Sequence, residues 1–134
     1  KSKVNSSIDA MNELKRLQEQ ELLRKIFKEL EGQQENLNWL LEKHGQDGYR
    51  KTIFEERNIE IVSALTRCVN ELPIKYKEIS DPIRSTVLEL RIYNGGDKKH
   101  LEEAEGYLYS AIQAVKVAEE QFSVDNIKMI AHSD

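Results

Sequence analysis

The side chains best suited to chemistry in this 134-residue chain are three histidines, one cysteine and several adjacent carboxylates. His44, His100 and His132 are the candidate metal ligands. A di-iron site in a helical bundle uses inward-facing glutamates together with Glu-x-x-His pairs on two helices. The sequence contains no Glu-x-x-His, and His100 with Glu103 shows the reverse order. The histidines are therefore predicted to face water or cap helices, with no bound metal or cofactor.

The lone cysteine, Cys68, could serve as a nucleophile with a histidine elsewhere in the chain. It lies between Leu65 and Leu72 in a repeating apolar pattern. That pattern predicts a core thiol, and a thiol buried in apolar surroundings is inert. Adjacent glutamates such as Glu102 and Glu103 act as acid and base only when burial raises one pKa, and on amphipathic helices such pairs face water. The sequence therefore predicts a protein that is not an enzyme.

Composition narrows the class of partner. Charged residues make up 33% of the chain and the net charge is −4, with no basic stripe interleaved with aromatics, which argues against nucleic acid. No apolar run approaches the ~20 residues of a membrane span. One cysteine allows no intrachain disulfide, so nothing requires an oxidising compartment and a cytoplasmic location is favoured. Because the chain begins with Lys1 rather than Met, we expect residues 1–134 to be one domain of a longer protein.

The clearest predicted element is a helix from Asp97 to Phe122, which extends to about Ala131 if Met129 continues its pattern. Apolar residues recur there at spacings of three and four, as in a helix packed along other helices. One row is large (Leu101, Leu108, Val115, Phe122) and the other is alanine (Ala104, Ala111, Ala118). An alanine at every seventh position lets a neighbouring backbone come close. The other helices are therefore predicted to pack against this one.

Two other segments complete the predicted fold. A first helix runs from about Ser7 to His44 and ends at a turn. Gly45 is the first residue after the helix, a position that glycine often occupies. The middle segment, from Tyr49 to Tyr93, contains Pro73 and Pro82, yet its apolar phase continues across both prolines. A kinked helix keeps its apolar residues on one side across the kink, whereas a loop that reverses the chain need not preserve that pattern. The sequence thus favours an all-α antiparallel bundle of three long helices, the middle one interrupted near the prolines. The alternative is a four-helix up-down bundle whose third helix begins at Pro82.

Three large side chains lie off the apolar stripe of the first helix, namely Leu14, Leu17 and Trp39. Exposed apolar residues on a charged helix indicate a partner-binding surface, unless they pack against the middle segment. We therefore predict a scaffolding or oligomerisation module that binds a protein partner, or itself, through coiled-coil-like helix faces. The alternative is an extracytoplasmic sensor domain of a membrane receptor, whose helices would continue into membrane spans. A small ligand-binding or enzymatic bundle is a third hypothesis.

Overall fold

The computed structural model describes residues 3–94 and 96–131, and in these ranges the chain is helical with no strand. The all-α prediction is confirmed. Four α-helices follow one another, with a single 3₁₀ turn, η1, between the second and the third: α1 (Lys3–Lys43), α2 (Lys51–Glu71), η1 (Ile74–Tyr76), α3 (Lys77–Tyr93) and α4 (Lys98–Ala131).

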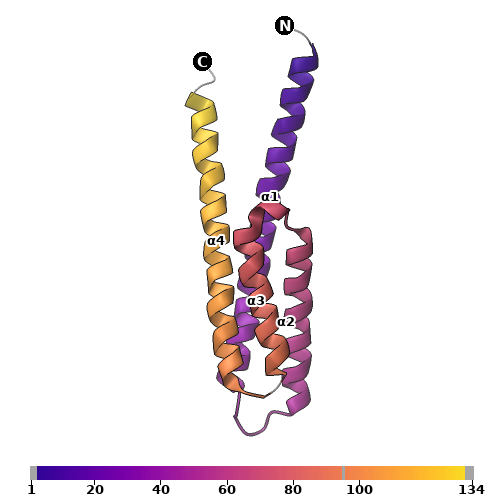
Figure 1. Ribbon diagram of the computed structural model, residues 1–134, viewed down its shortest axis with the longest axis vertical. Coiled ribbons are helices and arrows are strands. Elements are labelled where there is room, and N and C mark those ends of the chain that lie inside the picture. The colour runs from indigo at the N-terminus through magenta and orange to yellow at the C-terminus, as the bar shows by residue number, and fades with distance from the viewer. Residues whose placement is uncertain (1–2, 95, 132–134) are drawn as a thin grey trace.

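The helices pack as neighbours around a square. Close backbone approaches join α1 to α2, α2 to α3, α3 to α4 and α4 back to α1, while within the described ranges the backbones of diagonally opposite helices do not approach each other closely. Figure 1 shows each helix running opposite to the next one along the chain. Every helix therefore has two neighbours, and all four bury one side against a shared core.

The single middle arm from Tyr49 to Tyr93 is not present, and the helix count matches the four-helix alternative. The chain becomes extended at Leu72 and Pro73 (ψ 131° and 151°), and α3 then packs beside α2. Both α2 and α3 bury one face against the same core, so apolar residues recur at spacings of three and four in each of them. The apolar pattern can therefore continue across the prolines without one continuous helix. Pro82 does not open the third helix, since it lies inside α3, five residues after Lys77.

The alanine row of α4 faces α3, as close approach requires. Ala104 and Ala111 are fully buried, and Ala118 is half-buried. His100, one turn before Ala104, contacts Glu89 of α3, which fixes the direction of the row. The α3–α4 contact is the most extensive in the bundle, although α3 is the shortest α-helix. Small side chains thus allow these two helices to lie close together.

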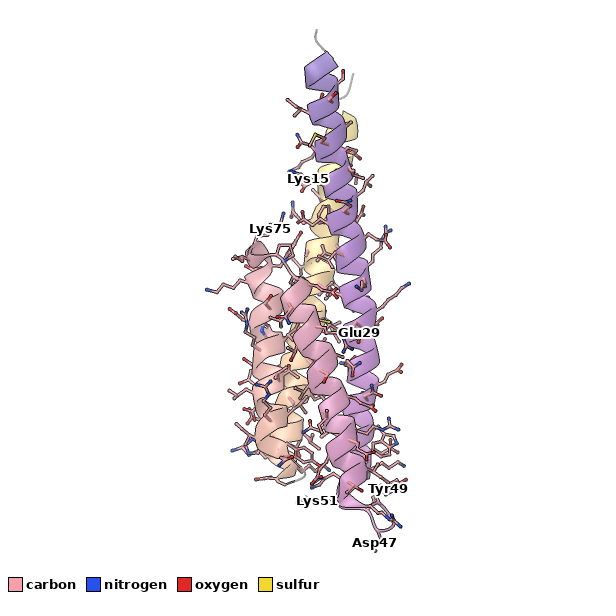
Figure 2. The ribbon with its side chains drawn as sticks, turned by 90° about the vertical axis from the view of Figure 1, so that its right-hand side faces the viewer. Lys15, Glu29, Asp47, Tyr49, Lys51 and Lys75 are labelled. Carbon is pink, nitrogen blue, oxygen red and sulfur yellow. The ribbon has the colours of Figure 1, made fainter. Side chains whose placement is uncertain are left out.

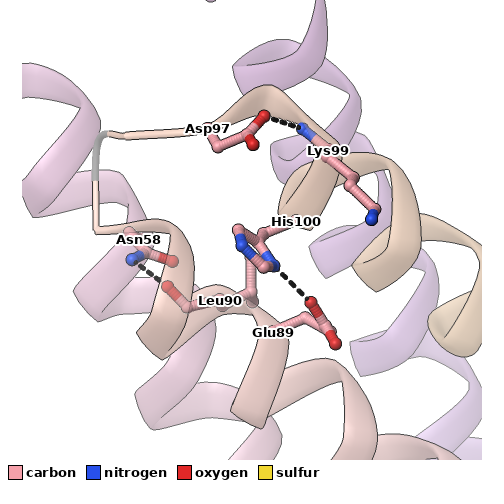
Figure 3. Close-up of polar contacts among 6 residues, drawn as sticks. All are labelled: Asn58, Glu89, Leu90, Asp97, Lys99 and His100. Carbon is pink, nitrogen blue, oxygen red and sulfur yellow. Dashed lines mark hydrogen bonds and ion pairs between the residues drawn. The ribbon is translucent and has the colours of Figure 1, made fainter.

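The first closing turn follows the sequence prediction. Gly45 has φ +79°, the left-handed conformation that glycine adopts most easily after a helix end. At the second turn, Asp97 accepts a hydrogen bond from the backbone N–H of Lys99 at 2.9 Å and so caps α4 (Figure 3). The ends of the helices that these turns join are therefore well defined.

Helices α1 and α4 extend beyond α2 and α3 at one end of the bundle. Lys75 and Tyr76, in the connection between α2 and α3, both contact Glu19, so this connection reaches α1 at that level. Residues 3–18 of α1 and 119–131 of α4 project past it at the same end of the bundle and spread apart toward their tips (Figure 1). We call these segments the N-terminal arm and the C-terminal arm. Neither arm has α2 or α3 beside it.

Candidate functional site

The N-terminal arm carries the largest exposed apolar side chains of α1. Leu14 is 55% exposed and Leu17 is 50% exposed, and Ile8 and Met11 are exposed to a similar degree. Below the arm, α1 buries its apolar residues in the core instead (Leu23, Ile26, Leu30, Leu37, Leu40). The change occurs where α2 and α3 end. Leu14 and Leu17 thus lie on a part of α1 that neither α2 nor α3 covers.

The exposed apolar residues lie mainly on the outer side of the arm. The side that continues the core stripe of α1 is polar, since Asn12, Lys15, Arg16 and Glu19 line a groove between the arms. Leu14 lies about three helical turns before Lys25, whose side chain is 68% exposed, and Leu17 lies about two turns before Arg24, whose side chain is 58% exposed. Leu14 and Leu17 therefore point away from the core.

A groove of about 620 Å³ lies between the arms, above the start of α3. Its floor is apolar, with Ile79, Ala118 and Phe122, and its rim is charged. Lys15 on α1 and Lys75 in η1 both line it, and they lie on the same side of the molecule (Figure 2). The rim also carries acidic groups, so the groove has no single sign of charge that would select an anion or a cation.

A hydrogen-bonded cluster closes the bottom of this groove. Glu19 accepts hydrogen bonds from Tyr76 and from Lys75, the second at 2.5 Å. Burial acts to raise the pKa of Glu19, but these two donors outweigh it and the pKa is lowered. Burial, and then the Glu19 carboxylate, raise the pKa of Tyr76. The cluster therefore holds the α2–α3 connection against α1. Its carboxylate, Glu19, already accepts two hydrogen bonds and is not placed to act as a general base.

Trp39 is placed differently from the two leucines. It is half-buried at the closed end of the bundle, 5.7 Å from the Tyr49 ring and 5.8 Å from the Phe54 ring. The Arg57 guanidinium lies 4.3 Å from its ring centroid. Trp39 is about 37 Å along the helix from Leu14, so the three predicted partner-binding residues do not form one surface.

The two described histidines connect helices. The Nδ1 atom of His44 lies 2.7 Å from the Tyr93 hydroxyl. The Nδ1 atom of His100 lies 2.8 Å from Oε2 of Glu89 (Figure 3). Both are half-buried and lie at helix ends, His44 directly after α1 and His100 in the first turn of α4, whereas His132 lies outside the described residues. Where the structure describes the chain, no three His, Cys, Asp or Glu side chains gather as a metal site.

Cys68 is a core residue, as predicted, and is 3% exposed. Burial, together with the carboxylates of Glu29 and Glu71, raises the pKa of its thiol to about 11. A thiol is nucleophilic only as the thiolate, which is scarce at neutral pH when the pKa is that high. Cys68 therefore packs between helices and is not poised for chemistry.

Asn58 is a buried polar residue that the periodicity did not single out. It lies on the core side of α2, is 6% exposed, and donates from Nδ2 to the Leu90 carbonyl of α3 at 2.8 Å (Figure 3). Its Oδ1 is buried without a partner. The sequence did contain a sign of this role, since Asn58 lies between Phe54 and Ile61 on the apolar stripe. A single buried amide at such a position can fix the register of two helices.

A second exposed apolar surface lies on the outer side of α2 and α3. Ile59 is 64% exposed, Leu88 is 59% exposed and Ile92 is 52% exposed. Two shallow grooves between these helices are bordered by Arg91. Here each helix still has both of its neighbours, so this surface is an ordinary outer face. It does not interrupt the packing of the bundle as the arms do.

Comparison with protein-family models, with curated proteins and with solved structures gave no match to this chain. In the ranges that the structure describes, no helix is both long enough and apolar enough to cross a membrane. The geometry of the arms is therefore the basis on which a function can be argued.

Proposed function

We propose that this chain is a non-enzymatic protein–protein interaction module, which acts as a scaffold through the exposed face of its N-terminal arm. One observation carries the proposal. Ile8, Met11, Leu14 and Leu17 each expose half or more of their surface along consecutive turns of one helix that lacks inner neighbours. The three-residue spacing turns successive side chains by about 60°, so they form an apolar strip that winds around the arm. Exposed apolar strips of this kind mark interaction sites in soluble proteins. Leu14 and Leu17 are assigned to the binding surface, and Trp39 mainly to packing at the closed end.

Site-specific photo-crosslinking tests this proposal in cells that make the protein at its normal level. A benzophenone amino acid is placed at Leu14 or at Leu17, and in a separate variant at Leu88. Leu88 is the matched control, because it is also a leucine and is 59% exposed against 55% for Leu14. We expect protein adducts from positions 14 and 17 and none from position 88. Absence of adducts from both arm positions, or equal yields from position 88, would show that the arm is not the binding surface.

A second candidate is the extracytoplasmic sensor domain of a membrane receptor. One observation favours it, since the start of α1 and the end of α4 lie at the same end of the bundle on helices that run side by side (Figure 1). Two helices entering one membrane need this arrangement. Apolar stretches of ~20 residues on both sides of this segment in its parent sequence would support the sensor, and their absence would rule it out.

A further inference from the structure

We propose that α2 is a detachable helix, which leaves the bundle as one unit while α1, α3 and α4 stay packed together. This motion does not involve the N-terminal arm, so it is independent of the proposed function. Three features of the structure support it. Helix α2 is the most loosely packed of the four helices, its ends are poorly stabilised, and the other three helices are joined to one another without it.

The two seams of α2 are the loosest in the bundle. Close backbone approach of α2 to α1 and to α3 is less extensive than at the other two seams, although α2 is longer than α3. On the α1 side a groove of about 150 Å³ reaches the buried side chains of Ile26 and Cys68, and on the α3 side a groove of about 320 Å³ reaches Val87. By contrast, a groove of about 280 Å³ on the α1–α4 seam is lined by exposed and half-buried residues. Fewer dispersion contacts therefore hold α2 in place.

Polar contacts also hold α2 weakly. Within the described ranges, two side-chain hydrogen bonds join α2 to its neighbours. One is the exposed pair of Lys25 and Glu71, and the other runs from Asn58 to the Leu90 carbonyl. An exposed ion pair contributes little to stability. The Oδ1 atom of Asn58 is buried without a partner and would regain hydrogen bonds to water when α2 leaves, which offsets part of the cost of opening.

The ends of α2 lack the features that stabilise helix termini. The N-cap residue Arg50 makes no side-chain hydrogen bond to the first turn, Lys51 begins the helix and Glu71 ends it. The charges of Lys51 and Glu71 oppose the helix dipole, whereas α3 has Glu78 in its first turn and Arg91 in its last. Most of the stability of a helix in a protein comes from the packing of its apolar face, so α2 should lose its helical structure when it leaves.

The other three helices stay connected without α2. The alanine row holds α4 against α3, and α4 also packs on α1. Helices α1 and α3 lie on a diagonal, but side chains join them at both ends. At the closed end, the Nδ1 atom of His44 lies 2.7 Å from the Tyr93 hydroxyl. At the other end, Glu19 of α1 accepts hydrogen bonds from Lys75 and Tyr76, directly before α3.

Both connections of α2 can serve as hinges. The turn before α2 contains Gly45 and Gly48 in the left-handed region, with φ +79° and +92°, and the backbone is extended directly after α2. Departure of α2 would uncover apolar side chains that line its seams, among them Ile26 and Val87, and would expose Cys68. The bundle therefore contains an apolar groove that is hidden while α2 is in place and accessible when α2 is out.

Labelling of Cys68 by the thiol reagent dithionitrobenzoate in native buffer tests this motion. When α2 closes faster than the reagent reacts, the labelling rate measures the population of the open state. The control is Val115→Cys in a chain that also carries Cys68→Ala, because Val115 is fully buried on α4. We expect Cys68 to be labelled at least about tenfold faster than the control, whose thiol becomes exposed only by global unfolding.

Two further substitutions separate opening of α2 from global unfolding and from fraying. Ala111→Leu weakens the α3–α4 seam, so it should speed labelling of the control about fivefold or more and leave the labelling of Cys68 unchanged. Arg50→Asp supplies an N-cap side chain at the far end of α2 from Cys68. It should slow labelling of Cys68 about fivefold, which fraying near Cys68 alone would not do.

Three results would overturn the detachable helix. If Cys68 is labelled as slowly as the control, or if Ala111→Leu speeds both equally, α2 opens only with the whole bundle. If Arg50→Asp leaves the labelling of Cys68 unchanged, the motion is confined to one end of α2. Should the control chain not fold, amide exchange in increasing urea makes the same comparison, and amides 58–68 must open together at lower urea concentration than amides 104–115.

Discussion

Replacing Asn58 with Asp is expected to lower the free energy of unfolding at pH 7 by about 3–5 kcal/mol, the cost of an uncompensated buried charge. The side chain is 6% exposed, and its Nδ2 donates to the Leu90 carbonyl at 2.8 Å. A carboxylate there would direct an acceptor at an acceptor inside the core. Arg91 borders the adjoining groove, but it is exposed, and exposed ion pairs recover little.

The loss should depend on pH in a defined direction. Burial raises the pKa of the new carboxyl in the folded state, so the folded state holds its proton more tightly than the unfolded state does. The destabilisation is therefore smallest below the unfolded pKa of about 3.9 and grows as the pH rises toward the folded pKa. Urea denaturation of Asn58→Asp and of the unsubstituted chain at pH 4 and pH 7 measures the difference.

Asn58→Leu is the control for this prediction. It removes the unpartnered Oδ1 and one of two hydrogen bonds to the Leu90 carbonyl, which still accepts from the Asn94 backbone N–H at 3.3 Å. The loss should therefore be only about 0.5–1.5 kcal/mol, with no pH dependence between pH 4 and pH 7. An Asn58→Asp loss that is equal at both pH values, or no larger than that of Asn58→Leu, would mean that Asn58 is not buried between α2 and α3.

Replacing Ala111 with Leu should lower the free energy of unfolding by about 1–3 kcal/mol through overpacking. Ala111 is fully buried at the middle of the alanine row, where α4 lies against α3, with Leu108 and Val115 also fully buried on either side. The added carbons have no free space, so either the helices separate or side chains leave their preferred rotamers.

Ala10→Leu provides the matched control, because the chemical change is the same and Ala10 is exposed. Alanine and leucine are both good helix formers, so the control should change stability by less than about 0.5 kcal/mol. Chemical denaturation at low protein concentration compares the two variants. Equal stabilities would place the alanine row against solvent or a loose gap and would require a different packing of α3 and α4.

Periodicity predicted well those features that depend on a single helix. The helical class, the turn at Gly45, and the burial of Ala104, Ala111 and Cys68 all follow from local spacing. The middle segment was interpreted incorrectly, because spacing records which side of a helix is buried and not whether the chain reverses. The extended backbone at Leu72 and Pro73 decides that point.

The candidate surface was found only in part, for the same physical reason. Leu14, Leu17 and Trp39 all lie off the stripe of α1, and the sequence treats them alike. Which of them is covered depends on neighbours. The turn after α1 brings Tyr49 to Trp39 and the start of α2 brings Phe54 to it, whereas α2 ends before the level of Leu14. Asn58 was missed because its importance lies in a contact with another helix.

The most direct test of the account is backbone amide hydrogen exchange, measured on the purified chain. The account predicts that residues 3–18 and 119–131, the two arms, exchange much faster than the rest of α1 and α4, because neither α2 nor α3 covers them. Exchange should be slowest in the core segments 23–40 and 101–115. Arms that exchange as slowly as these core segments would contradict the claim that the N-terminal arm leaves its apolar side chains uncovered.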